Sequence, residues 1–196
     1  RALTVDLTAF QIPWDNMQVQ TVWNGTFPAI NNIGSAEVRG AELGFKTLLP
    51  WNFTLMINAT YAVSKTEESF DSSEGFIEKG TILPLAPRWT GSTVLSWNDQ
   101  WGNFALNGSL GASYQGDSKN NFGNTLPIDA LTTYSASFGI IGVKWRYAPT
   151  LNFSITNLTN ERAMLAGVVS RDETANSDIY VPAQPRTISI SAGISF

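Results

Sequence analysis

Apolar side chains occupy every second position in the segment Arg186–Phe196 at the end of the chain. A two-residue period places alternate residues on opposite faces of a β-strand. A strand with one apolar face and one small, polar face that ends on an aromatic residue is typical of a transmembrane β-barrel. The apolar set is Ile188, Ile190, Ala192, Ile194 and Phe196, and the residues between them are Thr187, Ser189, Ser191, Gly193 and Ser195.

The same alternation recurs along the chain, and each repeat has about the length that a tilted strand needs to cross a bilayer. We therefore predict an all-β fold, a transmembrane antiparallel β-barrel. The nine predicted strands are 2–12, 16–23, 36–48, 51–64, 86–98, 102–116, 128–142, 144–158 and 185–196.

The connections between these strands alternate in length. Short turns are predicted at 13–16, 49–51, 98–101 and 141–143, and long polar loops at 24–35, 65–85, 117–127 and 159–184. Outer-membrane barrels have short turns on the periplasmic side and long loops outside. An odd number of strands makes the first strand run in the same direction as the last. Because an open sheet edge is not tolerated in lipid, we expect a longer protein to supply further strands.

Composition excludes several classes of function. No segment has the run of about 20 apolar residues that a transmembrane helix needs. The net charge of -4 argues against a nucleic-acid partner. The chain has no cysteine and no histidine, which removes the usual thiolate nucleophile, general base and metal ligands. We therefore expect no enzyme, no cofactor and no bound metal.

Aromatic residues cluster near the predicted strand ends, where a membrane protein places its interfacial girdles. A soluble β-sandwich, such as a lectin, would instead hold them in mid-strand. One predicted girdle at the short turns contains Trp14, Trp51, Trp97, Trp101 and Trp145, and a second near the long loops contains Tyr61, Trp89, Tyr114 and Tyr134.

Charged residues divide between the loops and the predicted barrel interior. The acidic loop clusters lack the spacing of a calcium site, so solvated charge is the preferred interpretation. Four Asn-x-Ser/Thr triplets lie inside predicted strands and follow from the polar alternation rather than from glycosylation. The predicted inward charges are Asp6, Glu42, Lys46, Arg88, Lys144 and Arg146.

Four segments resemble, in order, segments of TonB-dependent outer-membrane receptors. They are Val38–Glu42 (VRGAE), Leu83–Thr90 (LPLAPRWT), Ser154–Asn160 (SITNLTN, with Thr159 where an aromatic residue is usual) and Pro185–Thr187 (PRT) before the final strand. The resemblance implies a barrel of about 22 strands filled by an N-terminal plug, of which this chain forms roughly the last nine strands. It identifies Ile194 and Phe196 with the family's terminal barrel-assembly strand.

The resemblance also implies uptake of a scarce nutrient, driven by the inner-membrane TonB complex. A ferric siderophore is the expected ligand; cobalamin, a carbohydrate or an aromatic compound stays open. A passive porin, an outer-membrane enzyme and an adhesin are the alternatives. Residues expected to contact the ligand are Phe70, Phe76, Arg88, Asn120, Asn121 and Phe122, although loop aromatic residues also pack loops together.

Two arginines, Arg39 and Arg186, have outward parity near the predicted outer rim. Because arginine pairs well with phosphate, we expect both to contact lipopolysaccharide. Replacing both by glutamine is therefore expected to weaken lipopolysaccharide binding by the full-length protein. Unchanged binding in a lipopolysaccharide retention assay would contradict this expectation.

Overall fold

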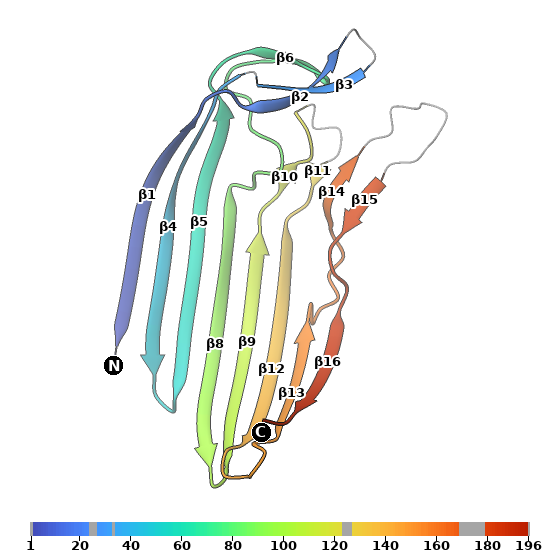
Figure 1. Cartoon of the computed structure of the whole chain (residues 1–196). Helices are drawn as coiled ribbons and strands as arrows, with labels where there is room; N and C mark the ends of the chain where they lie inside the picture. The colour runs from blue at the N-terminus through green and yellow to red at the C-terminus, as the bar shows by residue number, and fades with distance from the viewer. Residues whose placement is uncertain (1, 24–26, 33, 123–126, 169–178, 196) are drawn as a thin grey trace.

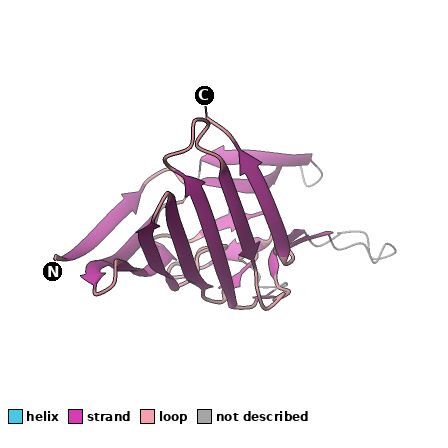
Figure 2. Ribbon diagram, turned by 90° about the horizontal axis from the view of Figure 1, so that it is seen from below, coloured by secondary structure: helices cyan, strands magenta, loops and turns pink. Residues whose placement is uncertain are grey.

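The computed structural model describes residues 2–23, 27–32, 34–122, 127–168 and 179–195. Its main element is a curved antiparallel sheet of eight strands (Figure 1). Within the described residues the sheet is open, with one edge at each end of the strand order (Figure 2). In sheet order the strands are β1 (Leu3–Trp14), β4 (Ala36–Leu49), β5 (Phe53–Thr66), β8 (Trp89–Trp101), β9 (Phe104–Gln115), β12 (Leu131–Gly142), β13 (Thr150–Thr156) and β16 (Thr187–Gly193).

The register confirms that apolar and polar side chains lie on opposite faces. One row of directly paired residues crosses all eight strands and is almost entirely apolar. The neighbouring row, one residue away on each strand, is largely serine, and the hydroxyls of Ser109 and Ser137 lie 2.8 Å apart. The first row is Leu3, Thr47, Leu55, Leu95, Leu110, Ala136, Ile155 and Ile188, and the second includes Thr54, Ser96, Ser109, Ser137, Ser154 and Ser189. We call the two sides the apolar face and the polar face.

The apolar face is exposed because no other described element packs against it. Leu7 on β1 is 77% exposed and Ile190 on β16 is 72% exposed. A contiguous exposed apolar surface of this kind marks contact with a partner or a membrane.

Short turns join the strands at one end of the sheet, which we call the short-turn end. The β4–β5 turn places Trp51 and Asn52 at φ of +58° and +61°, and Phe53 N donates to Pro50 O over 3.4 Å. Two successive positive φ angles define the tight turn that matches the twist of a hairpin. Trp51 projects into solvent from this turn, and Trp101 ends β8 at the same end.

Long connections lie at the opposite, long-loop end, and each contains a small hairpin (Figure 1). The segments after β1, β5, β9 and β13 therefore carry paired backbone of their own. The hairpins are β2 (Gln18–Trp23) with β3 (Phe27–Asn32), β6 (Phe70–Ser72) with β7 (Gly75–Ile77), β10 (Ser118–Lys119) with β11 (Pro127–Ile128), and β14 (Met164–Val168) with β15 (Ile179–Pro182).

The predicted strand 16–23 is not part of the main sheet, so the expected count of nine strands is wrong by one. Its counterpart β2 pairs with β3 in the first long connection, while β1 pairs directly with β4. Met17, just before β2, is only 3% exposed and belongs to the loop packing. With eight strands, β1 and β16 run in opposite directions, not in the same direction as expected.

Trp14 consequently lies at the long-loop end, opposite its predicted position. It pairs with Ala36 at the start of β4, and it shares the parity of the polar face. The other four predicted girdle residues, Trp51, Trp97, Trp101 and Trp145, lie toward the short-turn end. Among them, Trp145 packs against Phe104, with the centres of the two rings 5.7 Å apart.

The predicted strand 144–158 is also shorter than expected. β13 begins only at Thr150, and the segment before it is a turn in which Trp145 N donates to Gly142 O. Lys144 and Arg146 therefore lie in this turn and not on the polar face of a strand. The guanidinium of Arg146 stacks 5.1 Å from the centre of the Tyr147 ring. The terminal Phe196 lies outside the described residues.

None of the described residues forms a helix long and apolar enough to span a membrane.

Gly40 is fixed by close packing in the middle of β4. A Cβ added there would lie 2.4 Å from the backbone oxygen of Tyr61 and 2.5 Å from the Phe10 ring, which covers the glycine from the paired strand. Gly44, on the same face of the same strand, leaves room, because its nearest neighbour would lie 3.6 Å from the added Cβ.

Replacing Gly40 by alanine is expected to destabilise the full-length barrel by roughly 1–3 kcal/mol, the usual cost of overpacking. The cost arises because a backbone oxygen, unlike a side-chain end, does not move aside. Urea unfolding followed by heat-modifiable gel mobility measures the effect. Gly44→Ala is the matched control, and equal loss of stability in both variants would contradict the packing argument.

Candidate functional site

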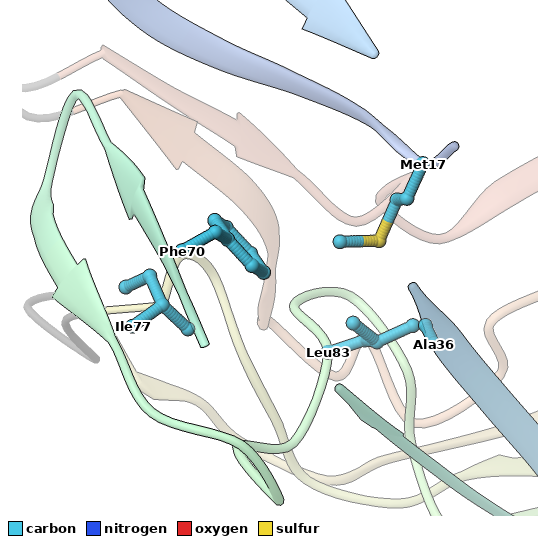
Figure 3. Packing of buried hydrophobic residues seen from close by; sticks show 5 residues of the cluster. All are labelled: Met17, Ala36, Phe70, Ile77 and Leu83. Carbon is cyan, nitrogen blue, oxygen red and sulfur yellow. The ribbon is translucent and has the colours of Figure 1, made fainter. Parts of the chain in front are cut away.

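The long-loop end is held together by a small apolar cluster (Figure 3). Its buried members come from the first two long connections and from β4. The Phe122 ring of the third connection packs edge-on against Phe70, with ring centres 5.8 Å apart and planes at 82°. The cluster therefore joins three connections into one unit. Its buried members are Met17, Ala36, Phe70, Ile77 and Leu83.

Backbone hydrogen bonds reinforce this unit. Glu67 N donates to Ser35 O over 2.8 Å, linking the second connection to the first. Leu85 N donates to Lys119 O over 2.7 Å, linking the second to the third. Buried amide and carbonyl groups need such partners, so these bonds keep the loops at fixed positions relative to one another.

Thr66, at the end of β5, is fully buried and anchors the return of the second connection. Its hydroxyl donates to Glu78 O over 2.9 Å and accepts from Thr81 N over 3.1 Å. The chain then runs back beside β5, where Leu83 N donates to Ser64 O. This route brings Arg88 to the start of β8.

A cavity of about 680 Å³ opens beside this segment, at the long-loop ends of β5, β8 and β9. Arg88, one of the expected ligand contacts, is among the residues that line it. Tyr61, Trp89 and Tyr114 were expected at this end as part of an aromatic girdle, but not as the lining of a common cavity, because the lining residues lie far apart in the chain. The principal lining side chains are Tyr61, Arg88, Trp89, Tyr114, Asp117, Ser118, Lys119 and Asp129.

The predicted ligand contacts divide into different environments. Phe70 is 8% exposed, so the alternative interpretation, loop packing, accounts for its ring. Phe122 is half-buried against it. Phe76, by contrast, is 64% exposed at the β6–β7 hairpin. Asn120 and Asn121 are half-buried near Phe122, and each already interacts with other groups of the protein.

The two predicted lipopolysaccharide contacts also differ from each other. The Nε of Arg39 lies 2.5 Å from Oε2 of Glu37, and the other carboxylate oxygen, Oε1, accepts a hydrogen bond from the amide of Gln11. This pairing offsets the charge of Arg39. Arg186 is exposed, and its guanidinium donates to Leu158 O over 3.5 Å.

The segment Ser154–Asn160, at the end of β13, is hydrogen-bonded to the residues just before β16. The buried amide of Asn157 donates to Glu161 O and Gln184 O, and its oxygen accepts from Glu161 N, each over 2.8 Å. Asn160 accepts from Arg186 N over 3.1 Å. The asparagines of this motif therefore serve the architecture and do not point to a ligand.

Among the described residues, no three aspartate or glutamate side chains lie close enough to hold a metal ion.

An antiparallel sheet with one exposed apolar face, one polar face and loops sorted by length is the wall of an outer-membrane type of β-barrel. The sequence comparison agrees, because residues 1–158 match the family described as TonB dependent receptor-like, beta-barrel. The chain belongs to this family of outer-membrane receptors, whose members are transporters rather than enzymes.

Solved structures show the same fold. The ferric yersiniabactin uptake receptor FyuA from Yersinia pestis superimposes with a TM-score of 0.76 at 20% identity, covering 99% of this chain and 28% of that one. The ferric preacinetobactin receptor BauA from Acinetobacter baumannii superimposes with a TM-score of 0.73 at 20% identity, covering 99% of this chain and 27% of that one. The unliganded ferric citrate transporter FecA superimposes with a TM-score of 0.73 at 20% identity, covering 99% of this chain and 29% of that one.

The chain thus spans between a quarter and a third of the length of these receptors. A search of curated proteins finds no matching sequence.

The contrast between Phe70 and Phe76 gives a direct test of the loop packing. Phe70→Ala is expected to destabilise the loop unit by about 3 kcal/mol or more, as for other buried aromatic residues. The effect is expected as faster amide hydrogen exchange in the three joined connections of the full-length protein. Phe76→Ala is the exposed control and is expected to leave exchange unchanged; equal effects would contradict the packing role.

Proposed function

We propose that the chain is the C-terminal part of the barrel of a longer outer-membrane receptor, which binds a ferric siderophore and imports it with TonB-coupled energy. The observation that carries the proposal is the row of paired, almost entirely apolar residues from Leu3 to Ile188, on a face of the sheet that no other described part of the chain covers. A bilayer is the environment in which such a face is stable. In this proposal Trp51, Trp97, Trp101 and Trp145 lie at the inner interface.

The substrate class is supported by the neighbours, whose names specify ferric yersiniabactin, ferric preacinetobactin and ferric citrate. At 20% identity these likenesses concern the fold, so the ligand of this chain is our inference. The segments that resemble the family do not narrow the choice of ligand, because Gly40 and Asn157 serve packing and hydrogen bonding.

The mechanism follows from the division of the molecule into two ends. Loop residues on the outside are proposed to capture the ligand, with the exposed Phe76 as a first contact and the half-buried Asn120 and Asn121 as further contacts. The polar face then lines the path inward. The energy-coupling segment and the plug belong to the rest of the longer protein, and no bond in the ligand is made or broken.

The experiment is iron uptake by cells that carry or lack the full-length gene. We expect the intact strain to take up a radiolabelled ferric siderophore, drawn from a panel of catecholate, hydroxamate and mixed types, only when TonB is active. A passive porin would instead give TonB-independent flux of many small solutes. No TonB-dependent uptake of any ferric complex would contradict the proposed substrate class.

The loop contacts are tested in the same assay. Phe76→Ala is expected to raise the half-saturating ligand concentration several-fold without lowering the amount of folded receptor. Tyr147→Ala, at the short-turn end, is the aromatic control. A wild-type concentration dependence for Phe76→Ala would remove this residue from the binding site.

A further inference from the structure

The polar face of the sheet has two parts that differ in charge. Among the described residues its charged side chains are Asp6 on β1 and Glu42 and Lys46 on β4. From β5 to β16, every described residue with the parity of this face is uncharged, and hydroxyl and amide side chains predominate. We call the middle of this uncharged part, on the adjacent strands β9, β12 and β13, the neutral wall (Figure 1). It consists of Asn107, Ser109, Gly111, Ser113, Thr133, Ser135, Ser137, Gly139, Asn152 and Ser154.

The three charged groups on β1 and β4 require partners from the rest of the longer protein. None of them forms an ion pair within the described ranges of the chain. A charge that faces a barrel interior is stable when an opposite charge or fixed hydrogen bonds offset it. We therefore expect protein to be held against β1 and β4, whereas the neutral wall creates no such requirement.

The neutral wall is also low, because glycines let the neighbouring polar side chains lie flat on the sheet. A Cβ added at Gly139 would lie 2.6 Å from Oδ1 of Asn152 and 2.7 Å from Oδ1 of Asn107, so both amides fold over this glycine from the strands on either side. At Gly111, the hydroxyl oxygen of Ser135 takes the corresponding place, 2.6 Å from the added Cβ. Polar atoms therefore stay at the surface of the sheet without long side chains that project into the interior.

A surface of this kind suits a ligand that must leave as readily as it arrives. Passage through a protein requires binding that is weak and repeated along the route. Hydroxyl and amide groups both donate and accept hydrogen bonds, so they exchange water for ligand without a preferred sign of charge. A hydrogen bond to a charged group is stronger, so a fixed charge would retain a ligand of opposite sign or repel one of the same sign.

We propose that the imported ligand, a polar chelate, moves inward along the neutral wall, with Asn107 and Asn152 as exchangeable contacts near the short-turn end. The side of the interior formed by β1 and β4 instead holds protein in place. The proposal rests on the proposed function and adds the route that the ligand takes within the barrel.

The test uses the full-length protein in cells, in a background without other cysteines, and compares two single cysteines at the same depth. Thr4 and Ser135 belong to one row of paired residues on the polar face, Thr4 beside Lys46 and Ser135 on the neutral wall. With TonB active, a bulky, water-soluble methanethiosulfonate reagent is expected to label Ser135→Cys at least about tenfold faster than Thr4→Cys, because thiol reactivity follows access to solvent. Equal rates, or a shielded Ser135→Cys, would overturn the proposal, and this result does not depend on which ligand is imported.

Transport by the labelled receptor is the second readout. Labelling of Ser135→Cys is expected to lower the maximal rate of ferric siderophore uptake at least about fivefold without raising the half-saturating concentration, because the label blocks the route and not the capture site. A reductant, which removes the label, is expected to restore the rate measured before labelling. Full uptake by quantitatively labelled Ser135→Cys would overturn the route while leaving the proposed function intact. Absence of TonB-dependent uptake before labelling would contradict the proposed function instead, and the labelling rates alone would then test whether the neutral wall is open.

Discussion

The register of the antiparallel ladder is the constraint on which the rest of the structure depends. A backbone that crosses lipid must satisfy its amide and carbonyl groups internally, and within the described residues the ladder gives each strand between β1 and β16 a partner on both sides. A slip of one residue at any pair would move apolar side chains onto the polar face. Leu95 and Ser96 illustrate this constraint. They are adjacent in the chain but belong to a leucine row and a serine row on opposite faces of the sheet, so a shift of one residue would exchange them. The same pairing also requires a glycine at position 40, since the Phe10 ring and the backbone oxygen of Tyr61 on the paired strands leave no space for a side chain.

Alternation was sufficient to predict most strands and both faces, because a two-residue period has only one structural meaning when it persists across a bilayer. It failed at 16–23, where a short loop hairpin has the same period as a barrel strand, and nothing local specifies the pairing partner. The error then moved Trp14 to the wrong end. The turn after β8 was placed too early, since Asn98–Trp101 resembles a turn while the positive φ of Gly102 lies beyond it.

The candidate site was less predictable, because its residues meet only through tertiary packing. Phe70 and Phe122 come from different loops, and their contact depends on the route that Thr66 and Leu83 give to the second connection. Arg88 was expected to contact the ligand, but Tyr61 and Lys119, which line the same cavity, were not connected with it. The segments that resemble the family stabilise the fold: Asn157 and Asn160 form hydrogen bonds that join the end of β13 to the residues before β16. Motifs of this kind therefore indicate the fold but give no information about the ligand.

The central claim is that the apolar face of the sheet contacts lipid. The most direct measurement is a nitroxide scan along β5, in which single cysteines replace residues 53–63 of the full-length protein in a background without other cysteines, reconstituted in vesicles. The account predicts a two-residue period, with the Leu55 and Ile57 positions accessible to dissolved oxygen and shielded from a water-soluble nickel reagent, and the Thr54 and Asn58 positions showing the reverse. Loss of this period, or shielding of Leu55 and Ile57 from both reagents as in a soluble sandwich core, would contradict it.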